Sequence, residues 1–377
     1  NGTTLGGDNG VAVALMLMVL DDDEIEHPPV ECVFTTEEEV GLNGAKALDK
    51  SVLKARTMIN MDSEDEGVAT VSCAGGLRVQ FTKEIQRTTV QGSLLTLKVE
   101  GLLGGHSGQD IDKERQNADL LMARMIQRLL KETKGQLVSF NGGTKDNAIP
   151  RECEASLIYE SDEEAAKAEE LACELAETYA EELTPAEPDF SCEISCETNR
   201  TAEAIPQDAA KEFICAMRLA PNGIQKRNIK MDGFVVVSLN LGVVRTEEDR
   251  IVMIFSPRSS VASLQEDTKE RLNTLAETFG FTVSHSSEYP GWSFKEDSPV
   301  REICKESYKE LFGEDLKIEA IHAGLECGLF SDAIKGLDAI AIGPTIANCH
   351  TPDEYLTLDS FERFYEFLKD ILSRLAK

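Results

Sequence analysis

Carboxylates follow short apolar runs at three places near the start of the chain. Asp8 lies in LGGDNG, Glu38 and Glu39 lie in TTEEEVG, and Asp62 lies in NMDSEDEG. Side chains that follow the strands of a parallel sheet gather at its carboxyl edge, so we expect these carboxylates to converge. Like charges at such an edge repel one another unless a positive charge lies between them. The pattern therefore predicts an α/β sheet with a pair of divalent metal ions at its edge.

Each of these signals also has a simpler interpretation. Asp8 precedes a predicted helix and could be its N-cap, and Asp62 could lie in an ordinary turn. The adjacent Glu38 and Glu39 are more specific, because neighbouring side chains at a strand end point to different faces. One of them can bind a metal ion while the other faces a water molecule as a general base. Glu37 in the same run is expected to be solvated.

A histidine reaches a similar position near the other end of the chain. His350 follows a predicted strand and turn in IGPTIANCHTPDE. A lone histidine is more often a surface or packed residue, but this one would close the same sheet edge. Together with the carboxylates it favours a two-metal hydrolase.

Composition limits the classes of protein and partner. At 377 residues, with 41% hydrophobic and 28% charged residues, the chain is predicted to form about two domains of a soluble globular protein. The formal net charge of −30 argues against nucleic acid and anionic membranes as partners. No apolar run approaches the roughly 18 residues of a membrane-spanning helix. The ten cysteines form no CxxC pair, which favours reduced thiols in a cytoplasmic protein.

Helix and strand alternate in residues 1–75 and again in residues 290–377. This alternation predicts one catalytic α/β domain with a mostly parallel sheet, interrupted by the intervening residues. The chain opens at Asn1 and reaches LGGDNG before any strand, so we expect it to be truncated at its N-terminus. Helices are expected at Gly10–Leu20, Asn43–Leu53, Val300–Phe312, Gly324–Ala333 and Leu358–Leu375, and strands at Val30–Thr36, Thr57–Asp62, Leu316–Ile321 and Leu337–Ile342.

Residues 76–289 show a different pattern, in which strands are interleaved with amphipathic helices. We expect an inserted α+β domain with an antiparallel sheet. Helices are expected at Arg115–Thr133, Glu163–Leu183 and Ser260–Gly280, and strands at Thr89–Glu100, Glu152–Glu160, Phe190–Glu197, Gly233–Gly242 and Arg250–Ser256.

The order of eight motifs resembles that of the bacterial aminoacyl-histidine dipeptidases, also called Xaa-His or cytosol non-specific dipeptidases. These are relatives of carnosinase among the co-catalytic zinc peptidases, so the resemblance implies a zinc-peptidase-like catalytic domain. It covers essentially the whole chain, and the HAGLECG and NMDSEDEG motifs favour this branch over aminoacylases, tripeptidases and desuccinylases. The motifs are LGGDNG, FTTEEEVGLNGA, INMDSEDEG, GLLGGHSG, NAIPRE, SPRSS, HAGLECGLF and GPTIANCHTPDE.

The resemblance implies a role for each acidic motif. Asp8 would bridge two divalent ions, Glu39 and Asp62 would each bind one of them, and His350 would complete the second site. Glu38 would be the general base. The ions would most simply be zinc, and cobalt or manganese suit the same ligands.

The resemblance also assigns residues that would bind substrate. His106 in GGHSG would stabilise the oxyanion or bind substrate, reaching the site from a neighbouring subunit or on closure of the inserted domain as a lid. Asn147 and Arg258 would bind the substrate backbone and carboxylate, although Asn147 could cap a turn and Arg258 could pair at the surface. Glu326 in HAGLECG would orient a ligand or recognise the substrate amine. Pairing of inserted domains would give a homodimer.

One part of the family pattern is missing from the sequence. Relatives have a His-x-Asp motif upstream of the bridging aspartate, and no histidine precedes Asp8. One ion would then have fewer than three protein ligands. The sequence therefore predicts a metal-dependent dipeptidase that acts on Xaa-His and other small peptides. The alternatives are another amide hydrolase of the clan (aminoacylase, tripeptidase or aminopeptidase) and an inactive binding protein with the same fold.

Overall fold

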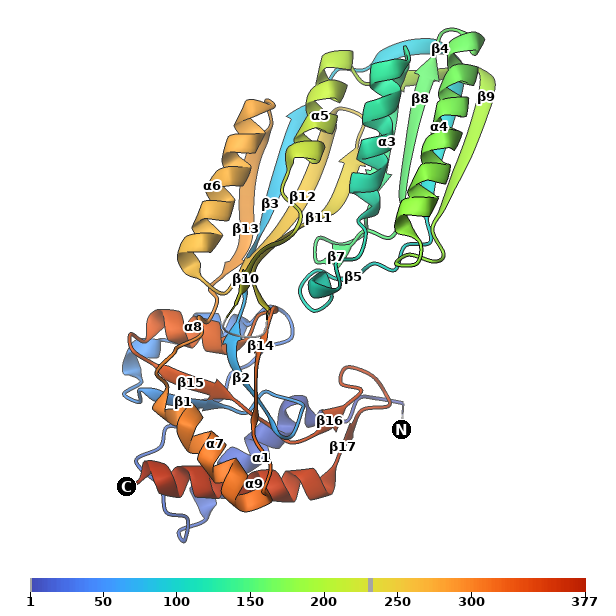
Figure 1. The fold of residues 1–377 in the computed structure, drawn as a ribbon. Coiled ribbons are helices and arrows are strands. Elements are labelled where there is room, and N and C mark those ends of the chain that lie inside the picture. The colour runs from blue at the N-terminus through green and yellow to red at the C-terminus, as the bar shows by residue number, and fades with distance from the viewer. Residues whose placement is uncertain (1, 230–232) are drawn as a thin grey trace. The chain divides into compact units, whose positions relative to one another are not determined.

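The structure, a computed structural model, describes residues 2–229 and 233–377. The chain forms two compact units, coloured along the sequence in Figure 1. Unit 1 consists of Asn1–Gly75 and Tyr289–Lys377, and unit 2 consists of Gly76–Glu288. None of the described helices is both long enough and apolar enough to cross a lipid bilayer. All ten cysteines are free thiols.

Unit 1 is built on a four-stranded sheet among the described residues. Its strands, in spatial order, are β1 (Thr57–Asn60), β15 (Asp338–Ala341), β2 (Val68–Cys73) and β14 (Lys317–Ile321). β1 is parallel to β15 and β2 is parallel to β14, whereas β15 and β2 are antiparallel. The predicted α/β class is therefore confirmed, and the antiparallel step comes from β2, which the sequence pattern did not predict.

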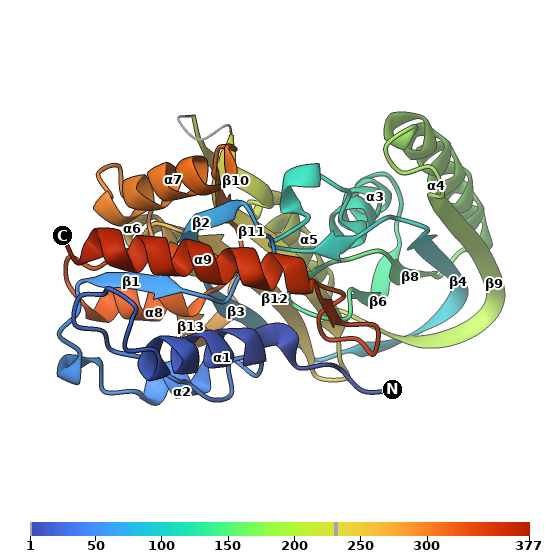
Figure 2. The ribbon, with the colours of Figure 1, turned by 90° about the horizontal axis from the view of Figure 1, so that it is seen from below.

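The helices of unit 1 lie on both faces of this sheet. Figures 1 and 2 show α8 (Glu326–Ala333) on one side and α7 (Pro299–Phe312) with α9 (Leu358–Leu375) on the other. Ser298 caps α7, Pro299 opens it, and Gly313 ends it in the left-handed conformation. These three helices and α1 (Gly7–Asp21) agree with the sequence prediction to within three residues.

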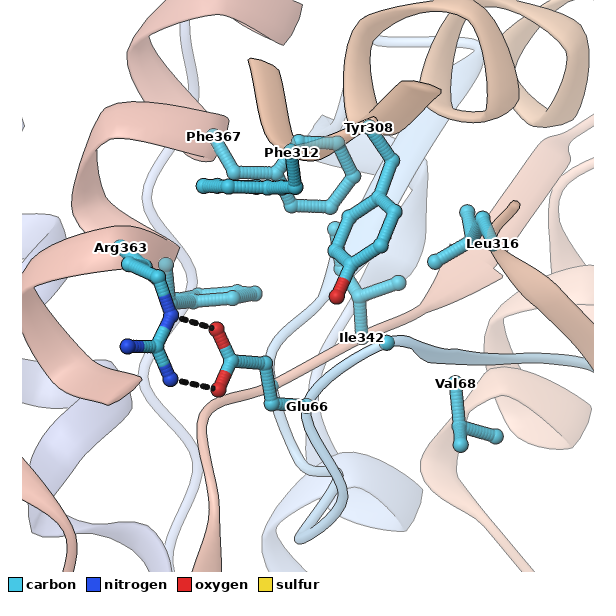
Figure 3. Close-up of a pocket in the computed structure, with 11 residues that line it drawn as sticks. Glu66, Val68, Tyr308, Phe312, Leu316, Ile342, Arg363 and Phe367 are labelled. Carbon is cyan, nitrogen blue, oxygen red and sulfur yellow. Dashed lines mark hydrogen bonds and ion pairs between the residues drawn. The ribbon is translucent and has the colours of Figure 1, made fainter. Parts of the chain in front are cut away.

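The loop before β2 is fixed to α7 and α9. Arg363 of α9 donates two hydrogen bonds, of 2.7 and 2.6 Å, to the Glu66 carboxylate (Figure 3). At Gly67, φ is +79°, and an added Cβ would lie 2.8 Å from the Tyr308 hydroxyl. The hollow between these residues has a volume of about 10 Å³, space for one water molecule at most. It is therefore a packing crevice, and the loop that follows Asp62 is held firmly.

Two predicted elements of unit 1 are wrong. Residues 30–36 do not form a strand, because an apolar run becomes a strand only where another backbone pairs with it. Residues 30–35 instead line a cavity that β1 also lines. The helix predicted at Asn43–Leu53 is two short pieces, α2 (Asn43–Ala47) and a 3₁₀ turn at Lys50–Val52. The break occurs because Leu48 is extended and the Asp49 side chain accepts a hydrogen bond from the Ser51 N–H.

Unit 2 is a nine-stranded sheet, counted over the described residues, with helices α3 to α6 on one face (Figure 1). The strand pairings with a defined register are antiparallel, as predicted. β3, β6, β10, β13 and α5 were not predicted. The spatial order is β13 (Thr282–Tyr289), β3 (Gly75–Glu84), β12 (Arg250–Ser259), β11 (Phe234–Thr246), β6 (Gln136–Gly142), β8 (Cys153–Tyr159), β4 (Thr88–Glu100) and β9 (Ser191–Ala204), with β10 (Gly223–Asn228) beside β11. The helices are α3 (Ala118–Glu132), α4 (Asp162–Leu183), α5 (Gln207–Leu219) and α6 (Ala262–Thr278).

Aromatic pairs fill the core between this sheet and its helices. The ring centroids of Phe81 and Phe255 are 4.8 Å apart, and Phe140 meets Phe213 edge to face at 5.4 Å. One carboxyl group is buried in the same layer. Asp119, in the first turn of α3, is 0% exposed, and burial raises its pKa from 3.8 to about 8 although the Cys153 thiol and Arg245 oppose the shift.

Replacing Asp119 with asparagine should stabilise unit 2 increasingly as pH rises. The folded state keeps Asp119 protonated up to its raised pKa, whereas the unfolded chain loses the proton near pH 3.8. The contribution of protonated Asp119 to the free energy of unfolding is therefore fully present below pH 3.8, and it is lost as the pH rises through the folded pKa of about 8. The asparagine side chain has no proton to lose, so the advantage of D119N should grow by up to about 1.4 kcal/mol per pH unit in this window.

Urea unfolding of D119N and the parent protein at several pH values measures this difference. D112N, which changes an exposed aspartate of the same unit, is the control and should show no such trend. An equal effect of D119N at low and high pH would contradict the assignment of a neutral, buried carboxyl group.

Candidate metal centre and active site

Asp8 lies in an irregular stretch at the start of α1. The helix is capped by Gly6 at φ 77°, without a side-chain hydrogen bond, and the φ and ψ angles of Asp8 and Asn9 are not helical. The interpretation of Asp8 as an N-cap is therefore wrong. Asn9 takes that role within the helix, because its Oδ1 accepts a hydrogen bond of 3.0 Å from the Ala12 N–H. The Asp8 carboxylate points away from the helix.

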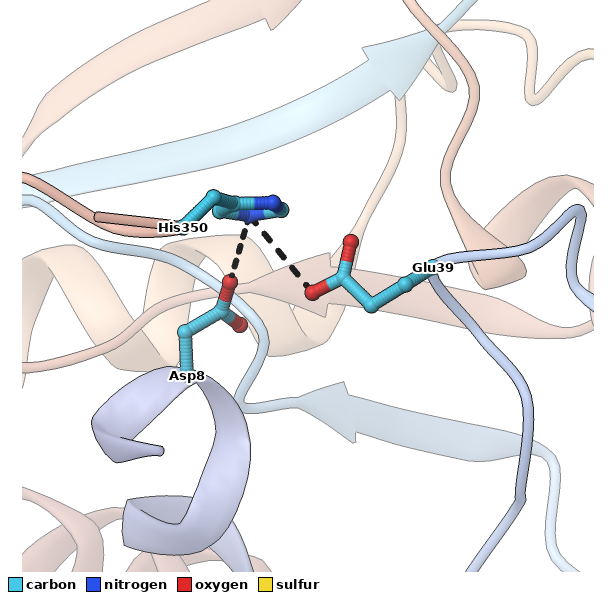
Figure 4. A group of neighbouring side chains, drawn as sticks. All are labelled: Asp8, Glu39 and His350. Carbon is cyan, nitrogen blue, oxygen red and sulfur yellow. Dashed lines mark hydrogen bonds and ion pairs between the residues drawn. The ribbon is translucent and has the colours of Figure 1, made fainter. Parts of the chain in front are cut away.

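A histidine and two carboxylates meet at this point (Figure 4). The Nε2 atom of His350 lies 3.0 Å from Asp8 Oδ2 and 3.5 Å from Glu39 Oε1. One ligand atom from each of the three residues lies within 4.8 Å of the others, a spacing that can hold a metal ion. Burial disfavours a charged His350, but Glu39 and Asp8 outweigh it and raise the pKa of the imidazole.

A tight turn presents Glu38 and Glu39. The Glu38 carbonyl accepts hydrogen bonds from the N–H groups of Gly41 and Leu42, and the Thr36 carbonyl accepts one from Gly44. A Cβ at Gly44 would lie 2.3 Å from the Thr36 oxygen, so the turn requires glycine there. Glu37, which was expected to be solvated, is exposed.

Asp62 follows the end of β1 and is held by Asn9. The Asn9 Nδ2 group donates hydrogen bonds to Asp62 Oδ1 at 2.9 Å and to the Met61 carbonyl at 3.2 Å. Burial, then Asp8 and Glu326, raise the pKa of Asp62 to about 6, and the bond from Asn9 opposes them. Asp62 is therefore part of the same electrostatic group as Asp8.

Glu38 has the most strongly shifted pKa of the glutamates at this site. Burial and then the charges of Asp62, Glu39, Glu326 and Asp8 raise its pKa to about 7. A carboxylate with this pKa can accept a proton from water and return it at neutral pH.

Glu326 lies beside this group at the first residue of α8. Its Oε1 accepts a hydrogen bond of 2.8 Å from the Thr35 hydroxyl, and burial raises its pKa. Glu64 and Cys349 also lie close to Asp8, with ligand atoms within 4.8 Å of one another. The sequence patterns did not predict these two residues, although each lies within two positions of a predicted ligand.

A cavity of about 750 Å³ adjoins the carboxylates within unit 1. The lining of this cavity is acidic at the side chains of the candidate site and apolar along α1, β1 and α9. The acidic residues are Asp8, Glu38, Glu39, Asp62 and Glu326, and the apolar ones include Met16, Val19, Met58, Leu368 and Leu372. The raised carboxylate pKa values show that burial and negative charge prevail at these side chains, and this oxygen and imidazole donor set fits divalent cations.

The three other residues with expected roles lie in unit 2. His106 is in β5 (Gly105–His106), which pairs with β7 (Ala148–Ile149). The Ser107 N–H donates to the Asn147 carbonyl at 2.9 Å, so Asn147 lies next to His106. Arg258 in β12 is only 7% exposed, so the alternative of a surface-paired arginine is wrong. Its charge acts on His106, which places these side chains in one group.

The hydrogen bonds of His106 define its tautomer. The N–H groups of Gly108 and Gln109 donate to Nδ1 at 3.2 and 3.1 Å, so Nδ1 carries no proton. Burial and then Arg258 lower the pKa of the imidazole, against the effect of Asp110. His106 is therefore neutral and presents Nε2–H as a hydrogen-bond donor.

The fold and the acidic group define a metallopeptidase class, and the comparison with known sequences agrees. Residues 2–374 match peptidase family M20/M25/M40. The chain belongs to this family.

Individual relatives match almost the whole chain. The cytosol non-specific dipeptidase of Escherichia coli K12 is 34% identical over 380 residues, which cover 99% of this chain and 77% of that protein. The crystal structure of aminoacylhistidine dipeptidase from Vibrio alginolyticus matches with a TM-score of 0.94 and 35% identity, covering 99% of this chain and 76% of the other. Aminopeptidase PepT from Bacillus cereus, at 16% identity and a TM-score of 0.50, shares the fold.

Zinc added to the chelator-treated protein should raise its melting temperature. A ligand at 100 times its dissociation constant stabilises the folded state by about 2.7 kcal/mol. The gain should be smaller at about pH 5.5 than at about pH 7.5, because protons compete for carboxylates with raised pKa values. E39Q should lose most of the gain, and E37Q, its exposed neighbour, should keep it. An equal gain in both variants would remove Glu39 from the metal centre.

Proposed function

We propose that this protein is a metal-dependent dipeptidase that hydrolyses Xaa-His and other small dipeptides. The observation that carries the proposal is the convergence of Asp8, Glu39 and His350 beside Glu38, whose pKa is about 7. A metal centre with an adjacent base that titrates near neutrality is the arrangement that hydrolysis of an amide needs. The names of the E. coli and Vibrio relatives support dipeptides as the substrate class.

The metal ligands follow from the side chains that meet at Asp8. One ion would be held by Asp8, Glu39 and His350, and a second by Asp8 and Asp62. Zinc is the proposed metal, because carboxylate and imidazole ligands at a catalytic site suit it. Two such ions supply positive charge that activates water and polarises the scissile carbonyl.

Glu38 moves the proton. Its carboxylate takes a proton from the attacking water and later delivers it to the leaving amine, and a pKa of about 7 suits both transfers. Glu326 carries a further negative charge beside Glu38 and binds the positively charged amino terminus of the substrate.

Unit 1 acts as the catalytic domain and unit 2 as a lid that also forms a homodimer. His106 donates its Nε2–H to the developing oxyanion, as its tautomer allows. Asn147 binds the substrate backbone, and the Arg258 guanidinium binds the terminal carboxylate. The protein acts in the cytosol, the compartment in the name of the E. coli relative.

The parent protein should release free histidine from an Xaa-His dipeptide when zinc is supplied. E38Q should keep its zinc and lose roughly 10²- to 10⁴-fold in kcat, because the amide cannot accept the proton. E37Q is the matched control and should keep its activity. Full activity of E38Q would contradict the base. A parent that cleaves only N-acyl amino acids or tripeptides would point to another amide hydrolase.

H106A should lower kcat by about 10²- to 10³-fold while the zinc content stays unchanged, because one oxyanion donor is lost. H285A changes an exposed histidine of the same unit and serves as the control. Metal analysis by mass spectrometry accompanies the kinetics. Loss of zinc in H106A would show that His106 is a metal ligand instead.

A further inference from the structure

The loop that contains His350 also forms hydrogen bonds with the main chain around Asp8. It joins β16 (Ile346–Ala347) to β17 (Tyr355–Leu356), which pair with each other. Hydrogen bonds of Thr351 hold the loop closed. Its N–H and its hydroxyl both donate to the Asn348 carbonyl. Its hydroxyl oxygen accepts a hydrogen bond from the Asp353 N–H, and its carbonyl accepts one from the Glu354 N–H. His350 therefore has a fixed position relative to the other end of the loop.

Glu354 stands at that other end. Its Oε2 accepts a hydrogen bond of 2.9 Å from the Gly6 N–H, and its Oε1 accepts one of 3.0 Å from the Asp8 N–H. The N–H groups of Asp8 and Gly6, with smaller contributions from those of Leu5 and Gly7, lower the pKa of the Glu354 carboxyl group. The Glu354 carboxylate thus accepts hydrogen bonds from the backbone on both sides of Gly7.

The chemistry of this contact favours a carboxylate over an amide. Ionised glutamate offers only acceptors, on two oxygens, whereas glutamine would aim an NH₂ donor at some of these N–H groups. The N–H groups at the start of a helix also carry partial positive charge, which favours an anion. The approach is close, because a Cβ on Gly7 would lie 3.1 Å from Glu354 Oε1.

The Asp8 carboxylate depends on this contact for its direction. The φ and ψ angles of Asp8 and Asn9 are not helical, and one helical hydrogen bond, of 3.0 Å from the Gly10 N–H to the Gly6 carbonyl, spans these two residues. The other hydrogen bonds that restrain this stretch include the bond from the Asp8 N–H to Glu354 and the bonds of the Asn9 side chain. Without Glu354, residues 5–8 can turn the carboxylate away from His350.

We propose that Glu354 is a positioning residue, which fixes the backbone of Asp8 so that its carboxylate faces His350 and the metal centre. The proposal rests on the proposed function, since it gives Asp8 the bridging role. One short loop then sets both the imidazole and the bridging carboxylate.

The test compares E354Q, E354D and E362Q with the parent. Glu362 is an exposed glutamate of α9 in the same unit, so E362Q controls for loss of one charge. We expect E354Q to fold, as judged by circular dichroism, and to lose roughly 10- to 100-fold in both kcat and metal affinity, with KM little changed. The visible spectrum of the cobalt-substituted protein should change in E354Q. E354D keeps the carboxylate and should recover part of the loss.

The experiments distinguish failure of the role of Glu354 from failure of the proposed dipeptidase function. A parent that neither binds metal nor cleaves dipeptides would remove the proposed function. An active parent whose E354Q variant has the same kcat, metal affinity and cobalt spectrum would overturn only the role of Glu354, even if its melting temperature fell, because that result describes an ordinary helix cap. If E354Q does not fold, E354D decides: an unaltered cobalt spectrum and kcat would overturn the proposal.

Discussion

Crowding of negative charge at one point of unit 1 is the constraint on which the rest of the site depends. Asp8, Glu38, Glu39, Asp62 and Glu326 line one cavity, and burial, followed by repulsion from the other four carboxylates, raises the pKa of Glu38 to about 7. Such a group is costly for a fold to maintain without positive charge. The repulsion favours the binding of divalent ions, and burial together with this repulsion gives Glu38 a pKa suited to proton transfer. The proposed metal binding and the proposed role of Glu38 as a base thus both depend on the crowding of buried carboxylates.

These carboxylates lie on irregular segments of the backbone, and specific hydrogen bonds hold each segment in place. The start of α1 is held by Glu354 and Asn9, the turn of Glu38 and Glu39 by the bonds of Gly41, Leu42 and Gly44, and the loop after Asp62 by the pair of Glu66 and Arg363. Loops can carry function only where a rigid scaffold restrains them. In unit 1 that restraint comes from residues that touch neither ion nor substrate in the proposed mechanism.

The failures of sequence prediction have physical causes in the same region. Residues 30–36 have the apolar character of a strand, yet strand formation depends on a paired neighbour, which local sequence does not reveal. Asp8 has the position of an N-cap, yet Gly6 and Asn9 take that role. Strands such as β3 and β6 escaped prediction because they gain their stability from long-range pairing within the sheet of unit 2.

The sequence by itself determined the α/β class, the antiparallel sheet of the intervening residues and the acidic motifs with their histidine, because these depend on periodicity and residue type. Only the tertiary structure decided that His350 meets Asp8 and Glu39, and that Glu354 grips the Asp8 backbone. It also decided the tautomer of His106 and the pKa of Glu38. His350 and Glu354 lie more than 300 positions from Asp8, so no local pattern in the chain encodes their contacts with it. The His106 tautomer depends on N–H groups only two and three positions away, but the direction of these groups is set by the folded backbone.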